Sequence, residues 1–211
     1  MIFVTGDSEM VDKSRLAAVI PAAGLSSRMG AFKPLLPVGD KTMIEASVCS
    51  ALSCADRAVV VLGWRGEEIR EKLSERFAGR LIFTENPDYA STDMFRSVRI
   101  ALEAIGSCDA FFIAPADMPM ISPAVYRLLA ASFTEDDGIL IPVTDDKRGH
   151  PPMISSRLIP DILAYDGTEG LRGFYRTRKV RQFAVDDTGI LKDADTPEDY
   201  RNLISNKATK R

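Results

Sequence analysis

The sequence has few cysteines, one histidine and no long apolar run. The three cysteines, Cys49, Cys54 and Cys108, form no C-x-x-C pair, and their odd number argues against a disulfide framework. No apolar stretch approaches the length of a membrane span. The single histidine, His150, is too little for a zinc site. These absences predict a protein of the reducing cytoplasm that has no contact with a membrane.

A strong excess of either charge is also lacking. The net charge is −3 and the pI is near 5.3, so there is no overall positive field for nucleic acid. The mean hydropathy of −0.04 and the 45% hydrophobic content are typical of a globular domain. Residues 1–15 lack the basic start and apolar centre of a signal peptide. We therefore expect an N-terminal extension (1–15) followed by one domain (16–211).

Strand-like and helix-like patterns alternate along the chain, as they do in proteins built from βαβ units. Buried strands are expected at 16–20, 57–62, 80–84, 110–114, 138–143 and 180–185. Amphipathic helices are expected at 42–53, 67–77, 93–105 and 123–133, with a last helix starting near Thr196. The order predicts a three-layer α/β/α sandwich around a Rossmann-like, mostly parallel sheet.

Residues 18–36 run from an apolar strand into a turn of small residues that carries one arginine and one lysine. Ligands of open α/β sheets bind where such strands end. Arg28 and Lys33 offer positive charge for a polyphosphate. The spacing excludes a Walker A loop and a G-x-G-x-x-G fingerprint. The residues predicted to approach a nucleotide at the start of this turn are Pro21, Ala22, Ala23 and Gly24.

The same turn matches a known signature. Residues 22–36 fill every fixed position of A-[AG]-G-x-S-x-R-M-G-x-x-K-x-L-L, and so the chain resembles the MobA-like NTP transferase family. Further motifs extend the resemblance, in the family's order, from residue 15 to about 203. It implies a fold of the nucleotide-diphospho-sugar transferase type and transfer of a nucleotidyl group with release of pyrophosphate. An ordinary turn with surface charges is the alternative.

Two aspartates are candidate ligands for Mg²⁺ or Mn²⁺. Asp117 follows strand 110–114, at the same predicted sheet edge as the turn; on its residues alone, a turn aspartate is an equal alternative. Asp195 precedes Thr196 and Pro197, which form a helix start without need of any function. The resemblance implies metal contacts for both aspartates.

Residues 86–98 resemble the family motifs N-P-x-[WY] and G-M-x-x-S-[LV]. The resemblance implies that Asn86 and Ser97 bind the nucleotide. Asp93 stands where the family has glycine, which adds bulk and negative charge. The residues also allow a simpler interpretation, in which Asp93 caps a helix and Ser97 faces solvent.

Two later motifs resemble the acceptor side of the family site. The R-G-H-P motif contains His150, and the G-x-x-G-x-R motif ends at Arg172. The resemblance implies that both residues contact the acceptor. A structural hydrogen bond for His150 and a surface position for Arg172 are the alternatives.

The resemblance also implies a mechanism and substrates. Lys33 would face the α-phosphate, Arg28 would hold pyrophosphate, and Asp117 would complete the catalytic set. The P-A-A-G form of the turn implies CTP, and the acceptor implied is molybdopterin, with molybdenum hydroxylase apoenzymes as candidate partners. A sugar or polyol phosphate acceptor, or a non-catalytic chaperone that binds nucleotide or cofactor, are the alternatives.

Overall fold

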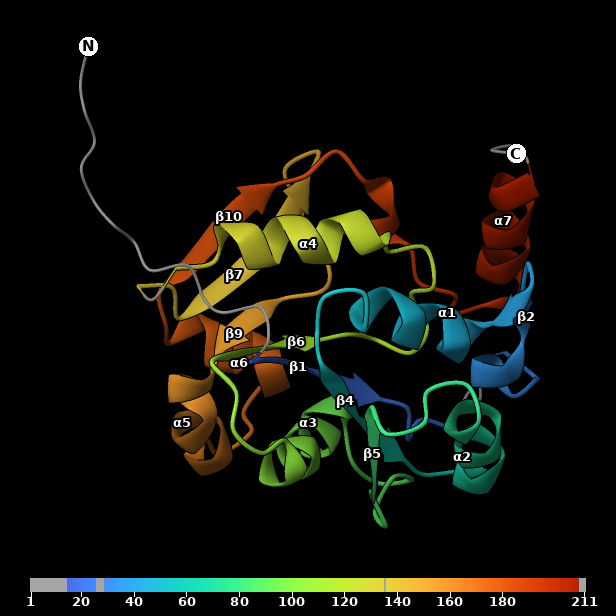
Figure 1. The fold of residues 1–211 in the computed structure, drawn as a ribbon, viewed down its shortest axis with the longest axis horizontal. Helices are drawn as coiled ribbons and strands as arrows, with labels where there is room; N and C mark the ends of the chain where they lie inside the picture. Colours follow the sequence, from blue (N-terminus) through green and yellow to red (C-terminus); the bar gives the residue numbers. More distant parts are fainter. Residues whose placement is uncertain (1–14, 26–28, 135, 209–211) are drawn as a thin grey trace.

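The computed structural model describes residues 15–25, 29–134 and 136–208, and its largest element is an eight-stranded sheet (Figure 1). The spatial order is β10-β7-β9-β6-β1-β4-β5, with β8 paired to β7. Their bounds are β1 Leu16–Pro21, β4 Arg57–Leu62, β5 Leu81–Glu85, β6 Ala110–Ile113, β7 Ile139–Thr144, β8 Lys147–Arg148, β9 Met153–Ser155 and β10 Val180–Ala184. A separate hairpin joins β2 (Pro37–Val38) and β3 (Lys41–Thr42).

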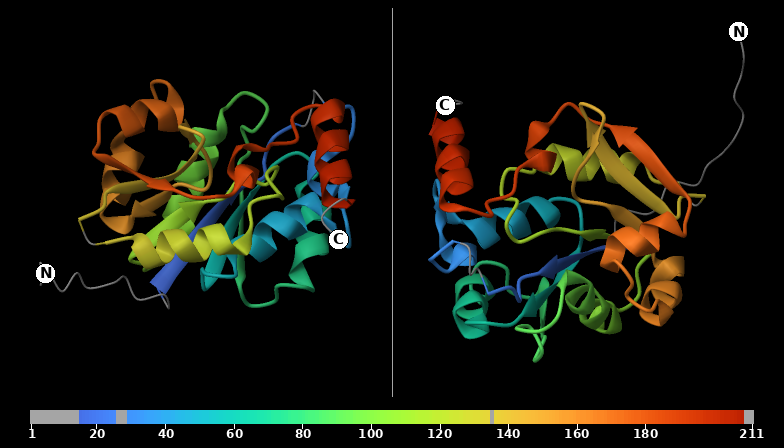
Figure 2. Two further views of the ribbon diagram at one scale, coloured as in Figure 1. Left: turned by 90° about the horizontal axis from the view of Figure 1, so that it is seen from above. Right: turned by 180° about the vertical axis from the view of Figure 1, so that it is seen from behind.

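Helices cover both faces of the sheet (Figures 1 and 2). One face packs against α1 (Met43–Ala51), α2 (Gly66–Ser74) and α4 (Pro123–Ser132), and the other packs against α3 (Met94–Ala104), α5 (Ile159–Ala164) and α6 (Gly170–Arg176). The alternation of β1 explains this division, because Ala18 and Ile20 point to the first layer while Ala17 and Val19 point to the second. The predicted three-layer sandwich is confirmed.

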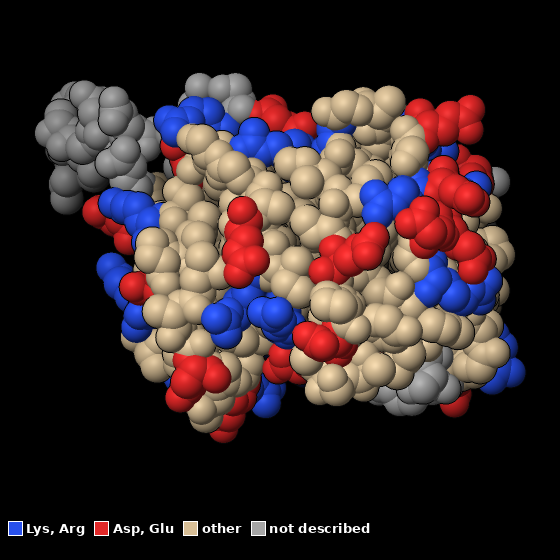
Figure 3. Space-filling view, turned by 90° about the horizontal axis from the view of Figure 1, so that it is seen from below, with Lys and Arg blue, Asp and Glu red and all other residues tan. Residues whose placement is uncertain are grey.

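The remaining helical elements of the described residues are α7 (Pro197–Ala208) and three short 3₁₀ segments, η2 (Lys33–Leu35), η3 (Ser156–Leu158) and η4 (Thr188–Leu191). Figure 1 shows α7 beside β2, and the Tyr200 hydroxyl donates to the Pro37 carbonyl at 2.7 Å. None of the described helices is both long and apolar enough to cross a bilayer. On the face shown in Figure 3, acidic and basic side chains are interspersed.

The sequence pattern missed the two strands that follow β7. β8 and β9 run antiparallel to β7, and β9 also pairs with β6 in the antiparallel sense. They have two and three residues, too few to show a periodicity of two. All the strands and helices that the sequence predicts are present, and their ends are shifted by at most three residues. The predicted extension lies outside the described residues except for Arg15, and the division of the chain at 15/16 stays a prediction.

A charged contact ties the edge strand β10 to the start of β7. Arg181 donates from Nε and Nη2 to the two oxygens of Asp137, both at 2.6 Å. Burial alone would raise the pKa of Asp137, but the hydrogen bonds from Arg181 and Thr134 outweigh it and lower the pKa below its ordinary value. The Asp137 side chain is 7% exposed and that of Arg181 is 38% exposed.

We predict that Asp137→Asn lowers the free energy of unfolding at pH 7 by about 1–2 kcal/mol. The effect is smaller than for a fully buried ion pair because solvent reaches Arg181 and screens its charge. Because the folded pKa of Asp137 is depressed, its stabilisation is present above the ordinary value of 3.8 and is lost as the pH falls through the folded pKa. Urea unfolding at several pH values measures this. Exposed Asp136→Asn is the control, and a difference that persists in strong acid would contradict the assignment.

Candidate active site

The segments that carry the predicted site meet at one edge of the sheet. β1 and β6 are adjacent parallel strands, so the chain leaves both at their carboxyl ends on the same side. The segment after β1 continues to Lys33 at the start of η2, and the segment after β6 contains Asp117. Asp195 arrives from the far end of the chain, just before α7.

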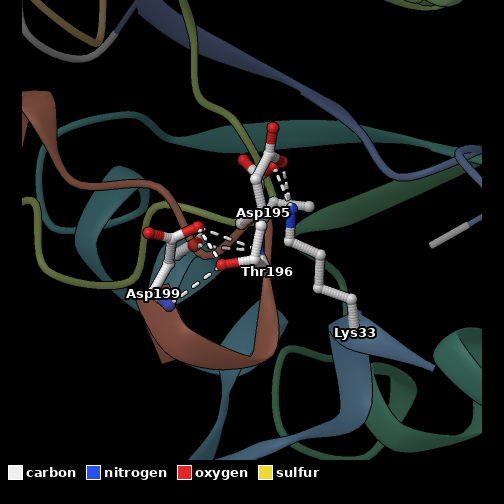
Figure 4. A network of polar contacts seen from close by, with 7 residues as sticks. Lys33, Asp195, Thr196 and Asp199 are labelled. Atoms are coloured by element: carbon white, nitrogen blue, oxygen red, sulfur yellow. Dashed lines mark hydrogen bonds and ion pairs between the residues drawn. The ribbon is translucent and has the colours of Figure 1, made fainter. Parts of the chain in front are cut away.

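Lys33 lies between the two predicted metal ligands. Its Nζ donates to Asp117 Oδ2 at 2.8 Å and to Asp195 Oδ1 at 2.8 Å. Figure 4 shows the Lys33 side chain extending toward Asp195. The Lys33 side chain is only 11% exposed, whereas the carboxylates are about one-third exposed. Burial lowers the pKa of Lys33, but the charges and hydrogen bonds of the two aspartates outweigh this effect, and the pKa is raised. Lys33 is therefore charged at neutral pH.

A reciprocal cap holds the segment that carries Asp195 (Figure 4). The Thr196 amide donates to Asp199 Oδ2 at 2.9 Å, and the Asp199 amide donates back to Thr196 Oγ1 at 3.1 Å. This arrangement is a capping box, which starts α7 as the Thr-Pro-Glu-Asp sequence predicts. The neighbouring Ala194 amide donates to the Asp117 carbonyl at 3.2 Å. The two aspartates are thus tied together through their backbones as well.

The pair of carboxylates fits a divalent cation. Both already contact one positive atom, the Lys33 ammonium, so their oxygens lie no more than twice 2.8 Å apart. Within the described residues no group of three or more His, Cys, Asp or Glu side chains could hold a metal. Mg²⁺ commonly takes one or two carboxylates and fills its other positions with water and substrate phosphates. Asp117 and Asp195 are sufficient for a site of that kind.

A cleft of about 370 Å³ opens beside these charges. Its wall combines backbone of the turn after β1 with the ion-paired side chains. The lining residues are Pro21, Ala22, Gly24, Leu25, Met29, Lys33, Pro34, Met94, Pro115, Ala116, Asp117 and Asp195. A Cβ built on Gly24 would meet nothing within 4 Å, so this part of the backbone faces open space. The cleft combines small residues with one lysine and two carboxylates, an arrangement suited to a polyphosphate that arrives with a divalent cation.

A smaller pocket of about 170 Å³ adjoins the cleft, with Pro21, Gly24 and Met94 in both walls. Its lining residues are Pro21, Ala23, Gly24, Asn86, Tyr89, Thr92, Asp93, Met94 and Ser97. This side pocket gathers the residues predicted to bind the base and ribose. The turn after β1 therefore separates two spaces, with Ala22 facing the cleft and Ala23 facing the side pocket.

Asn86 organises the side pocket through its own side chain. Its Nδ2 donates to Thr92 Oγ1 at 3.0 Å and to Ser97 Oγ at 3.2 Å, and its Oδ1 accepts from the Asp88 amide at 3.1 Å. Thr92 was missed by the sequence analysis, although the Asn-Pro-Asp turn that places it is a local signal. Ser97 is 3% exposed, so the alternative of a solvent-facing serine is wrong.

Asp93 caps α3 by accepting from the Arg96 amide at 3.2 Å, as the simpler interpretation predicted. It also lines the side pocket, so the two roles share one residue. The carboxylate that replaces the family glycine is therefore beside the space predicted for the nucleotide. Its backbone is extended, with φ −88°, and needs no glycine.

The acceptor-side candidates differ in position. His150 lies close enough to Asp117 to feel its charge, although burial is the larger effect and lowers the pKa of the imidazole. Its Nδ1 is buried with no hydrogen-bond partner among the described residues. Arg172 is exposed on α6 and lines neither the cleft nor the side pocket. Arg28 lies outside the described residues. The roles of all three stay predictions.

Comparison with known proteins gives the family of the chain. Residues 18–183 match the MobA-like NTP transferase domain. The chain belongs to this family. A molybdenum cofactor cytidylyltransferase of Escherichia coli (strain K12), a similar protein, is 28% identical over 89% of this chain and 94% of its own length. A probable molybdenum cofactor guanylyltransferase of Mycobacterium avium (strain 104) is 28% identical over 94% of this chain and 100% of its own.

The fold of the family is also found among solved structures. A nucleotidyl transferase from Methanothermobacter thermautotroptrophicus is 25% identical, with a TM-score of 0.78 over 93% of this chain and 99% of that one. The family, its fold and its relatives identify the chain as a nucleotidyltransferase.

We predict that Lys33→Ala lowers the rate of pyrophosphate release about a hundredfold or more, because one charge contact to the transition state is worth about 3 kcal/mol. Nucleotide affinity should fall much less. Single-turnover kinetics and equilibrium binding of the triphosphate separate the two effects. Lys41→Ala, which removes a lysine paired with Asp40, is the control. Turnover within tenfold of the parent would contradict the role of Lys33.

Proposed function

We propose that this nucleotidyltransferase transfers CMP from CTP to the phosphate of molybdopterin, depends on Mg²⁺ or Mn²⁺, and releases pyrophosphate in the cytoplasm. The observation that carries the proposal is the junction of cleft and side pocket at residues 21–24. On one side of it, Ala22 faces the ion-paired Lys33; on the other, Ala23 faces Asn86 and Ser97. A triphosphate in the cleft would place its base in the side pocket.

The transfer needs little proton chemistry from the protein. An oxygen of the acceptor phosphate attacks the α-phosphorus, a new P–O bond forms, and the bond to the β-phosphate oxygen breaks with its electron pair on pyrophosphate. The acceptor phosphate is already ionised near neutral pH. Catalysis therefore depends on alignment and on neutralising charge. Lys33, released from its carboxylates by a bound metal, would face the α-phosphate, and Arg28 would hold pyrophosphate.

Asp117 and Asp195 would hold the divalent cation. When bound, the cation supplies positive charge to the phosphate oxygens. The two aspartates would keep it at the cleft wall, where the capping box of Thr196 and Asp199 holds Asp195 in place. The two carboxylates would then pair either with the Lys33 ammonium, as in this structure, or with the cation.

Two features of the side pocket support cytosine. Its volume is about 170 Å³ and the Ala23 methyl group reduces the room that a purine would need. Ser97 Oγ accepts from Asn86, and since the described residues provide no acceptor for its own proton, that hydroxyl remains able to donate. The cytosine carbonyl oxygen is a suitable acceptor for such a hydroxyl.

The acceptor is proposed from the relatives and from one site feature. The cytidylyltransferase of Escherichia coli acts on molybdenum cofactor, and it aligns with most of this chain. His150 presents a buried, unpartnered Nδ1 near Asp117, where an acceptor phosphate or its ring could be hydrogen-bonded. Molybdenum hydroxylase apoenzymes, which use the dinucleotide product, are the partner proteins that this activity would serve.

The test is to offer CTP, GTP, ATP and UTP separately with Mg²⁺ and molybdenum cofactor, and to measure pyrophosphate release. The proposal expects release with CTP only when the cofactor is present. A parallel arm replaces the cofactor with a polyol phosphate. Release in that arm, or selective use of GTP with the cofactor, would contradict the proposed acceptor or the proposed base respectively.

We further predict that Ala23→Gly shifts nucleotide choice towards GTP. Removing one methyl group from a pocket changes discrimination by about tenfold. The ratio of kcat/KM for CTP and GTP measures the change, and Ala22→Gly is the control because Ala22 lines the cleft instead of the side pocket. An unchanged ratio in Ala23→Gly would show that the methyl group does not select the base.

A further inference from the structure

The turn from β4 to α2, Gly63–Gly66, packs against the start of the segment that follows β1. We call that segment, residues 22–36, the nucleotide loop. A Cβ placed on Gly63 would lie 2.5 Å from the Ala23 carbonyl oxygen and 2.8 Å from the Ala23 Cα. No side chain fits between these two backbones. The turn therefore contacts the loop at the residue that faces the side pocket.

The same turn contacts the far end of the loop, next to Lys33. The Trp64 ring meets the Phe32 ring edge to face, with centroids 5.3 Å apart and an interplanar angle of 86°. The Arg65 guanidinium lies 4.5 Å from the centroid of the Phe32 ring. Phe32 is 6% exposed and precedes Lys33 directly. The ring is held by an aromatic contact and a cation–π contact.

The backbone of this turn carries strain. Arg65 has φ 55° and ψ 34°, in the left-handed region that a residue with a Cβ rarely adopts. Its guanidinium pairs with Glu68, an exposed contact that contributes little to stability. Glycine would hold this backbone more easily, so an arginine here needs another explanation. The stacking of its side chain on Phe32 provides one.

We propose that Trp64 and Arg65 are positioning residues for Lys33. They immobilise Phe32 and thereby keep the adjacent Lys33 backbone where its ammonium reaches Asp117 and Asp195. Sequence motifs give no hint of this role, because the turn lies about thirty residues beyond the loop and contributes no group to the cleft. The inference rests on the nucleotidyltransferase site alone, whichever base or acceptor it uses.

The test measures the reactivity of Lys33 by competitive acetylation with acetic anhydride and peptide mass spectrometry, without nucleotide. A Lys33 held between two carboxylates has a side chain only 11% exposed and is shielded from the reagent, so it reacts slowly. Arg65→Gly removes the stacking group but relaxes the left-handed backbone. The expected result is about a two- to fivefold rise in Lys33 acetylation, the size of one exposed cation–π contact, without a lower melting temperature. Lys41 is the internal reference.

Matched variants separate positioning from a general structural effect. Trp64→Phe keeps an aromatic edge against Phe32 and should react like the parent, whereas Trp64→Ala should behave like Arg65→Gly. Arg70→Ala is the control. Like Arg65, Arg70 stacks on a phenylalanine, Phe83, and pairs with glutamates, but these contacts lie outside the nucleotide loop. It should leave Lys33 unchanged.

Three results would overturn the proposal: parental acetylation of Lys33 in both Arg65→Gly and Trp64→Ala, an equal rise at Lys33 and Lys41, or an effect of Arg70→Ala as large as that of Arg65→Gly. Because the measurement uses no nucleotide and no acceptor, its failure is distinct from failure of the proposed cytidylyl transfer.

Discussion

The site depends on the contact of one ammonium with two carboxylates. Lys33 reaches Asp117, 84 residues further along the chain, and Asp195, 162 residues further. Two partly buried carboxylates this close repel one another unless a positive charge lies between them. A cation between the two aspartates removes this repulsion. Lys33 supplies that charge in this structure. Under the proposed function, a divalent ion would take its place.

The fold brings these three groups together by different means. Parallel strands place the segments after β1 and β6 at one sheet edge, which accounts for Lys33 and Asp117. Asp195 needs α7, whose Leu203 packs in a small cluster with Met29 and Ala194. Met29 belongs to the nucleotide loop, so the last helix supports the loop as well as the aspartate. Packing at the end of the chain thus contributes to a site whose signature lies near its start.

The nucleotide half of the site is built more completely than the acceptor half. The cleft and the side pocket share the walls formed by Pro21, Gly24 and Met94. Within the side pocket, the Asn86 side chain donates hydrogen bonds to Thr92 and Ser97 and holds these residues in place. On the acceptor side, the candidate contact near Asp117 among the described residues is His150, whose Nδ1 is buried without a hydrogen-bond partner there. This asymmetry agrees with the range of relatives, which are named for different acceptors, molybdenum cofactor and 2-C-methyl-D-erythritol 4-phosphate.

Sequence by itself determined the three-layer fold and the position of the Lys33 turn and Asp117 at one edge of the sheet, because long periodic strands and a dense loop motif are local signals. Tertiary structure alone decided the antiparallel insertion of β9, the burial of Ser97, the exposure of Arg172 and the packing of Trp64 and Arg65 on Phe32. Each of these depends on contacts between segments distant in the chain. Periodicity and spacing carry no record of such contacts, since they describe only neighbours along one element.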